Sequence, residues 1–260
     1  MDRWLLIAST MLALIGSVRG MLAVHRGRRS RSTVLWMAAA LVCQLVFLAH
    51  RGQLRGVCPL ADRGEILVFL AWSLTLFYLL VGPVYRISLL GVFSAPVVVV
   101  FQVMALVPGV LDAQPRGITG GNPWHEMHSA TSVLAYGALA LASVAGVMFL
   151  VLDRQLKEHH LQSGLFQRLP PVRELLVSMV RLLWLGGGLL SLGILAGGLM
   201  PRDSKADHHM IAAHLIAALV VWTGYAVLLG VHTVRGLTGR RLALLTVAWF
   251  ILSLGVFAFI

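Results

Sequence analysis

Eight apolar runs of about 20 residues each constrain the fold of this chain more than any other feature. A helix of ~20 residues spans a hydrocarbon layer of ~30 Å and satisfies its own backbone polar groups there. Of the 260 residues, 58% are apolar and only 12% are charged, so lipid is the solvent for most of the chain. We expect an all-α, polytopic transmembrane bundle of about eight spans, with residues 1–260 forming one domain. The predicted spans are 4–24, 34–50, 65–82, 88–108, 129–152, 178–200, 210–231 and 242–260.

The basic residues indicate membrane topology. The chain carries a formal net charge of +11, but most of its Lys and Arg residues lie between the spans, which argues against nucleic acid as a partner. The loops after the first, fifth and seventh spans hold most of them: Arg26, Arg28, Arg29, Arg31, Arg154, Lys157, Arg168, Arg173, Arg235, Arg240 and Arg241. We expect these alternate loops in the cytoplasm and both termini on the outer side of the plasma membrane. Arg51, Arg55 and Arg63, in the second loop, are an exception to this pattern.

Two groups of histidines are expected near one membrane level. Five of the ten histidines stand at the start of the fifth and seventh spans: His125, His128, His208, His209 and His214. An imidazole near a helix N-terminus feels the positive end of the helix dipole, which disfavours its protonation. A neutral imidazole nitrogen is able to ligate a metal. The two groups therefore predict a metal-type site at the outer face.

His128 and His214 are the strongest candidates within these groups. Asn122 and Pro123 are typical of an N-cap and the first residue of a helix, so His125 and His128 are expected on one face of the first turns. His214 is expected about two turns inside its helix, where an ionisable side chain is costly and usually faces a cavity or a partner. An interhelical hydrogen bond from His214 to Ser or Thr is the alternative.

The neighbours of these histidines restrict the ligand. No acidic cluster or thiolate pair accompanies them, so hard cations and structural zinc are not favoured. A non-covalent haem b, held by one histidine from each of two helices, suits an apolar site better. In the sixth span the Gly193/Gly197 spacing predicts close helix packing, and a flat ligand against the glycines is the alternative. Glu65 either favours the N-terminus of its helix or orients a ligand histidine.

Three stretches carry a resemblance to a known family. Pro59 to Trp72 reads Pro-Leu-x-x-x-x-Glu-x-Leu-x-Phe-x-x-Trp, residues 94–96 read Ser-Ala-Pro, and Met127-His128 leads through Tyr136 to Asp-Arg-Gln-Leu-Lys at 153–157. These stretches resemble the cytochrome c assembly proteins of the CcsA and HemX-like group, multi-helix membrane proteins that handle haem. The tryptophan-rich loop that CcsA presents before its penultimate helix has no counterpart in residues 200–207, so the chain is more similar to the HemX-type branch.

The resemblance implies roles for particular residues. In the family, a histidine at the position of His128 is taken as an axial haem ligand on the outer side, with His125 as the local competitor here. For the second ligand we prefer His214 over His209 and His208. The resemblance and the positions of the remaining candidates suggest that three further side chains surround the site: Glu65, Trp72 and Tyr136.

The resemblance also implies a function. It predicts a non-catalytic component of cytochrome c biogenesis that holds or delivers haem b, with apocytochrome c and a ResB-like membrane protein as partners. A membrane b-type cytochrome for electron transfer is one alternative, although such proteins usually carry histidine pairs at both membrane levels. A cofactor-free transporter or regulatory membrane protein is the other.

Overall fold

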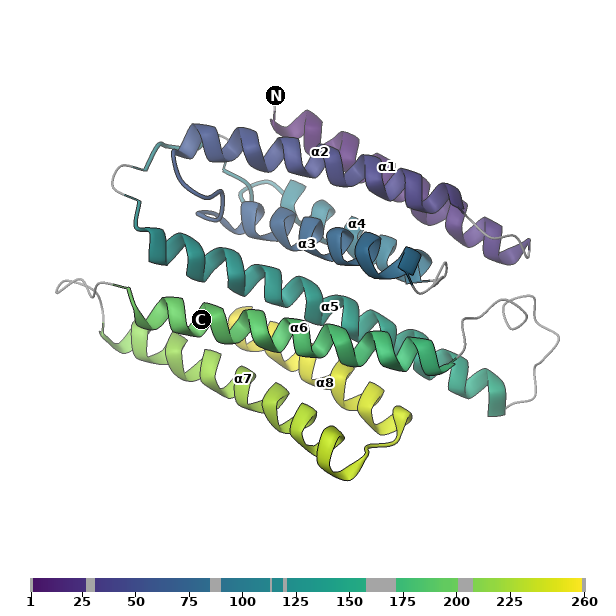
Figure 1. Cartoon of the computed structure of the whole chain (residues 1–260). Coiled ribbons are helices and arrows are strands. Elements are labelled where there is room, and N and C mark those ends of the chain that lie inside the picture. Colours follow the sequence, from purple (N-terminus) through teal and green to yellow (C-terminus); the bar gives the residue numbers. More distant parts are fainter. Residues whose placement is uncertain are drawn as a thin grey trace.

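The structure is a computed structural model that describes residues 2–26, 31–84, 90–112, 114–118, 121–157, 172–200 and 208–258. These residues form eight α-helices, which lie roughly side by side (Figure 1). The helices are α1 (Asp2–His25), α2 (Arg31–Arg55), α3 (Arg63–Val84), α4 (Leu90–Leu106), α5 (Pro123–Lys157), α6 (Val172–Gly198), α7 (His208–Arg235) and α8 (Gly239–Ala258). The prediction of an all-α polytopic bundle is confirmed.

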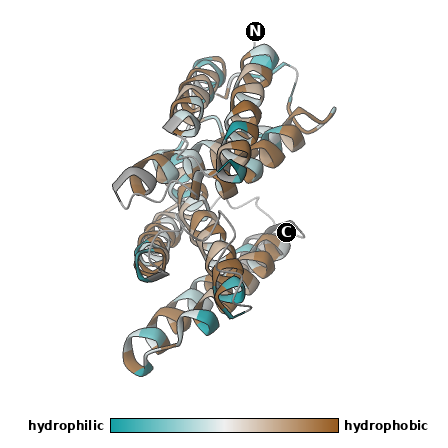
Figure 2. Ribbon diagram, turned by 90° about the vertical axis from the view of Figure 1, so that its right-hand side faces the viewer, coloured by the Kyte–Doolittle hydropathy of each residue, from teal (hydrophilic) through white to brown (hydrophobic). Residues whose placement is uncertain are grey.

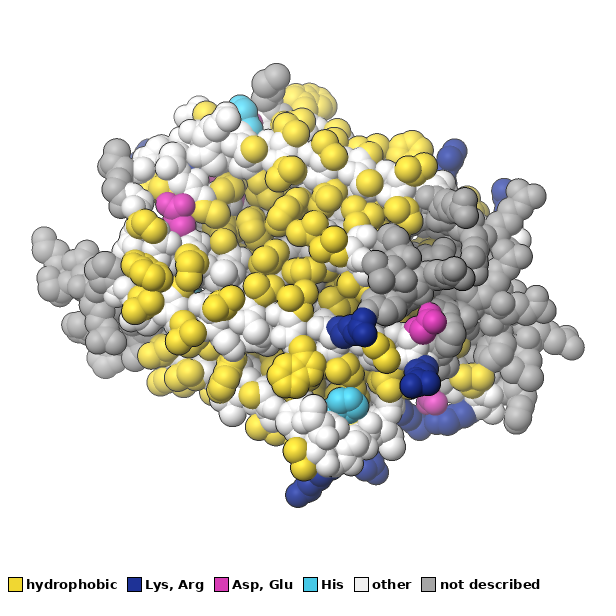
Figure 3. Space-filling view, viewed as in Figure 1, with side chains coloured by type: hydrophobic (Ala, Val, Ile, Leu, Met, Phe, Trp, Pro, Cys, Tyr) yellow, Lys and Arg dark blue, Asp and Glu magenta, His cyan; other side chains and the backbone are white. Residues whose placement is uncertain are grey.

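Seven of the described helices are long and apolar enough to cross a membrane. The exception is α4, which has 17 residues and contains Pro96. Hydrophobic residues make up most of the ribbon (Figure 2), and hydrophobic side chains cover the middle of the face shown in Figure 3. Large apolar side chains on the outside, such as Ile216 and Ile251, are more than 60% exposed. This pattern is what lipid requires of the outer surface of a bundle.

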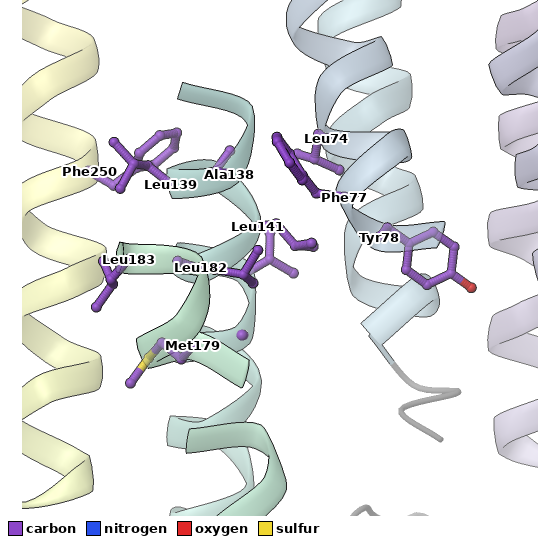
Figure 4. Close-up of a cluster of buried hydrophobic side chains, with 14 of the residues drawn as sticks. Leu74, Phe77, Tyr78, Ala138, Leu139, Leu141, Met179, Leu182, Leu183 and Phe250 are labelled. Carbon is purple, nitrogen blue, oxygen red and sulfur yellow. The ribbon is translucent and has the colours of Figure 1, made fainter. Parts of the chain in front are cut away.

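The helix α5 lies between two groups of helices. It packs against α3 and α4 on one side and against α6 and α8 on the other, and it is the most deeply buried of the seven spans. Figure 4 shows Leu141 of α5 between Leu74 of α3 and Leu182 of α6, and Leu139 of α5 beside Phe250 of α8. The many alanines and glycines of α5 permit this close approach of neighbouring helices.

One end of the bundle gathers several connections. The α2–α3 connection, the stretch before α5 and the end of α6 meet there, since Cys58, Asn122 and Met200 line one cavity. We call this end the α5 N-terminal end; it lies at the left in Figure 1. The predicted site residues at the starts of α5 and α7 also belong to this end.

Candidate functional site

The structure brings His128 of α5 and His214 of α7 together. The centres of the two imidazole rings lie 6.2 Å apart, and the ring planes are inclined by 65°. His128 is half-buried and His214 is exposed, so the pair opens onto the surface of the bundle. Two nitrogen-bearing rings from different helices therefore meet near the α5 N-terminal end.

The ring of His128 is held in place by α6. Its Nδ1 lies 2.7 Å from the carbonyl oxygen of Gly193. Because a carbonyl only accepts hydrogen bonds, this contact assigns the proton to Nδ1 and leaves the lone pair on Nε2. The ring also lies against Gly197, where an added Cβ would be 2.9 Å from Nδ1. The geometry presents Nε2 as the nitrogen available to a ligand.

The glycines of α6 show the close packing that their spacing predicts. A Cβ at Gly193 would lie 2.6 Å from the Oγ of Ser132, and a Cβ at Gly197 would meet the ring of His128. Since α5 covers both glycines, a flat ligand does not lie against this pair. Their absent side chains instead let α5 and α6 approach closely enough to hold His128.

The other candidate histidines have different surroundings. His125 is exposed and lines a cavity of about 310 Å³ beside Cys58 and Glu126, whereas His128 turns toward α6. His208 and His209 form the first turn of α7, and their side chains lie outside the described part of the structure. Of the five predicted histidines, the structure therefore joins only His128 and His214 within its described side chains.

Glu65 caps α3. The backbone N–H of Glu65 donates to Asp62 Oδ1 at 2.7 Å, and Glu65 Oε2 accepts from the backbone N–H groups of Ala61 and Asp62 at 3.0 and 3.4 Å. This reciprocal pattern is a capping box, with aspartate as the N-cap. It provides the helix N-terminal role that the sequence suggested, and a role in orienting a histidine stays a prediction.

Two arginines of α2 complete a buried ion network that the sequence did not reveal. Arg51 is 1% exposed and Arg55 is 6% exposed, and their Nε atoms lie 3.1 and 2.9 Å from Glu65 Oε1. Each also contacts Asp62, and Arg51 reaches Asp2 of α1 at 3.5 Å. These arginines are neutralised inside the protein, which explains why they departed from the topology pattern of the loops.

The network could have been suspected from local spacing. Arg51 and Arg55 are four residues apart on one face of α2, and Asp62 and Glu65 are three apart after a short loop. Sequence spacing does not distinguish a buried arginine pair from one in water. Arg51 also donates to the backbone oxygen of Asp112 at 2.8 Å, so the network connects α1, α2 and α3 to the stretch after α4.

Trp72 and Tyr136 lie deeper in the bundle. The ring of Trp72 packs against Phe69, with centres 5.3 Å apart, in the apolar cluster shared by α1–α4. The hydroxyl of Tyr136 lies near the hydroxyls of Tyr225 of α7 and Ser253 of α8. Contributions of either side chain to a haem site stay predictions.

Cys58 lies in the α2–α3 connection, outside the spans. Its backbone N–H donates to Glu126 Oε2 at 3.3 Å. Burial raises the pKa of the Cys58 thiol, and the nearby carboxylates of Glu126 and Glu65 raise this pKa further. The thiol is therefore a poorer nucleophile at neutral pH than an ordinary cysteine.

The helices and the histidine pair define a class: a multi-pass helical membrane protein with two imidazoles from different spans in contact at one end. The family described as cytochrome C assembly protein matches residues 61–259, and the chain belongs to this family. The predicted family is thereby confirmed.

Several relatives are named "Cytochrome c biogenesis protein CcsA". The chain is 26% identical to the one from Synechococcus elongatus over 257 residues, covering 82% of this chain and 79% of the relative. It is 25% identical to that of Crocosphaera subtropica, with 83% and 80% covered. For that of Chlamydomonas reinhardtii the identity is 24%, with 84% and 62% covered. The segment in which the tryptophan-rich loop would fall, 201–207, lies outside the described residues.

Proposed function

We propose that the protein holds or delivers haem b during cytochrome c biogenesis, with His128 and His214 as the axial ligands. The observation that carries the proposal is the meeting of these two imidazoles, from α5 and α7, with ring centres 6.2 Å apart. Membership of the cytochrome c assembly family supports it independently.

The two rings are close enough to hold one iron together. Histidine nitrogens bind transition metals at about 2 Å, and the ring centres of His128 and His214 lie 6.2 Å apart, so one iron would be within reach of both residues. The donor set also fits, because two neutral imidazoles suit haem iron. The exposure of His214 leaves one side of the pair uncovered by protein.

The protein's part in holding haem is to orient the ligands. The bond from His128 Nδ1 to the Gly193 carbonyl fixes the tautomer and the ring orientation, and such bonds also raise the basicity of the ligating nitrogen. His128 and His214 would hold the haem iron, and a bound haem would supply one-electron chemistry between its ferric and ferrous states. His214 is the more exposed of the two residues, so it would be the more accessible of the pair to haem.

The charge distribution supports an outer location for this site. The basic ends of α5 and the start of α8, with Arg154, Lys157 and Arg240, lie at the opposite end of the bundle from His128. In Figure 3, Lys and Arg side chains gather mainly toward the right-hand side, away from the α5 N-terminal end. By the positive-inside rule, that basic end faces the cytoplasm and the histidine pair faces outward.

The family also suggests the partners. The relatives' name points to cytochrome c biogenesis, and covalent haem attachment requires an apocytochrome with a Cys-x-x-Cys-His sequence. The two cysteines of this sequence, Cys43 and Cys58, do not form such a motif. We propose apocytochrome c as the recipient and a ResB-like membrane protein as the companion in the plasma membrane.

The test is the visible spectrum of the detergent-purified protein, expressed with ample haem, in its oxidised and dithionite-reduced forms. The wild type is expected to show sharp b-type bands with one haem per chain. His128→Ala and His214→Ala should each weaken or abolish these bands. His232→Ala is the matched control, because this histidine lies at the other end of α7.

Two outcomes would contradict the proposal. A wild type without haem, despite ample supply, would remove the cofactor and favour a transporter or regulatory protein. Two haems per chain, with one lost in His232→Ala, would favour a membrane cytochrome for electron transfer.

A further inference from the structure

Four polar side chains form a layer within α1–α4, inside the span region. Ser9, Gln44 and Gln102 are completely buried, and the indole nitrogen of Trp72 is buried as well. Gln102 Nε2 donates to Ser9 Oγ at 2.6 Å, and Ser9 Oγ donates to the carbonyl of Ala40 at 3.2 Å. The layer thus receives one polar side chain from each of four helices.

The layer lies two helical turns below the ion network. Three helices contribute to both levels through residues seven positions apart: Asp2 and Ser9 on α1, Arg51 and Gln44 on α2, and Glu65 and Trp72 on α3. Seven residues of α-helix advance about 10.5 Å and return to nearly the same face. Because Arg51 directly contacts both Asp2 and Glu65, the three residues below them lie at a similar depth and face the same interior.

Several polar atoms of this layer are unsatisfied by protein. Gln44 Nε2 and Oε1, Gln102 Oε1 and Trp72 Nε1 are buried and have no hydrogen-bond partner among the described residues. Such groups are costly in a protein interior surrounded by lipid. Two of the four atoms are donors and two are acceptors, which is the set that water complements, since it donates twice and accepts twice.

The surroundings restrict the size of a ligand. Apolar side chains from all four helices pack around Trp72, including Leu6, Phe47 and Val68, each of which has no exposed surface. A close-packed wall of this kind excludes a larger ligand. The absence of a carboxylate from the four side chains also disfavours a cation.

We propose that this layer is a binding site for ordered water inside the membrane-spanning part of α1–α4, bridging Gln44, Trp72 and Gln102. The water completes the hydrogen bonds of two amides and an indole. It continues the buried polar region that begins at the ion network two turns above. The site is separate from the histidine pair and does not depend on haem binding.

X-ray radiolytic footprinting of the detergent-purified wild-type protein tests this directly, because bound water generates hydroxyl radicals beside the side chains it contacts. Trp72 is expected to be oxidised several-fold faster than Trp222 and Trp249. These two controls are also partly buried tryptophans of spanning helices, but their indole N–H groups bond to protein, namely Ser191 Oγ and the Val221 carbonyl. Oxidation of Trp72 at or below the rate of both controls would overturn the proposal.

A variant provides the second measurement. Gln44→Leu keeps the approximate volume but removes one donor and one acceptor, so it should slow the oxidation of Trp72 and lower the melting temperature by several degrees. Gln53→Leu, at an exposed position of the same helix, is the control and should change neither quantity. If the layer were dry, Gln44→Leu would instead raise the melting temperature, because it would delete unpaired polar groups. Should this variant fail to fold, the wild-type comparison of the three tryptophans still decides.

Discussion

Replacing Gly197 by alanine would place a methyl group against the ring of His128. The new carbon would lie 2.9 Å from Nδ1 and 3.2 Å from Cε1, whereas ordinary contacts begin near 3.4 Å. The ring or the helix must therefore move by roughly 0.5 Å, in the region where Nδ1 bonds to Gly193 at 2.7 Å. This change perturbs the orientation of His128 without removing any of its atoms.

The size of the effect follows from two opposing contributions. Overpacking a well-packed site costs about 1–3 kcal/mol. Alanine favours a helix over glycine by up to about 1 kcal/mol. Gly198→Ala receives the second contribution alone, since a Cβ at Gly198 has nothing within 4 Å. Relative to Gly198→Ala, we expect Gly197→Ala to be less stable by about 1–3 kcal/mol.

The assay combines thermal unfolding in detergent with haem titration. At about 2–4 °C per kcal/mol for a chain of this size, Gly197→Ala should unfold several degrees below Gly198→Ala. Haem should also bind more weakly to Gly197→Ala, because the Nε2 of a displaced ring is misaligned. Equal unfolding temperatures and equal haem affinities in the two variants would refute the account of how α6 holds His128.

Three further predictions concern other parts of the protein. Glu65→Gln should destabilise the protein by about 3–5 kcal/mol, because it removes a negative charge that compensates two buried arginines. Thermal unfolding measures this loss. Glu174→Gln, at an exposed position, is the control and should leave the melting temperature nearly unchanged. Iodoacetamide should alkylate Cys58 slowly at pH 7, and the rate should keep rising at pH values above the usual thiol pKa. Glu126→Gln removes a negative charge that raises the pKa of this thiol, so this variant should react faster. An unchanged rate would contradict the effect of Glu126 on the thiol pKa. Trp222→Phe deletes the hydrogen bond from the indole N–H to Ser191 of α6, so it should lower the free energy of unfolding by about 0.5–1.5 kcal/mol. The same unfolding assay measures this loss against the wild type. An unchanged stability would show that this bond does not stabilise the fold.

The membrane fold was predictable because lipid imposes one strong requirement. An apolar run of about 20 residues has few stable alternatives to a spanning helix, so eight helices could be placed from hydrophobicity alone. The ends were less predictable: α5 extends from Pro123 to Lys157, beyond the apolar run 129–152. Polar residues continue a helix past the hydrocarbon layer, and hydrophobicity does not record where it ends.

The candidate site was predictable in part. Placement at helix starts suggested His128 and His214, and their ring contact follows from the arrangement of α5, α6 and α7. The carbonyl of Gly193 was not foreseeable, since every residue has one and only the packing selects it. The burial of Arg51 and Arg55 was missed for a similar reason: which face of α2 meets protein depends on contacts with α1, α3 and the stretch after α4.

The most direct measurement is electron paramagnetic resonance of the ferric, haem-loaded protein beside its His128→Ala and His214→Ala variants. Two axial imidazoles produce a low-spin signal, and loss of either ligand should convert it to high spin or release the haem. We expect a low-spin signal in the wild type that is lost in both variants. A low-spin signal that persists in either variant would contradict the assignment of His128 and His214 as the ligand pair.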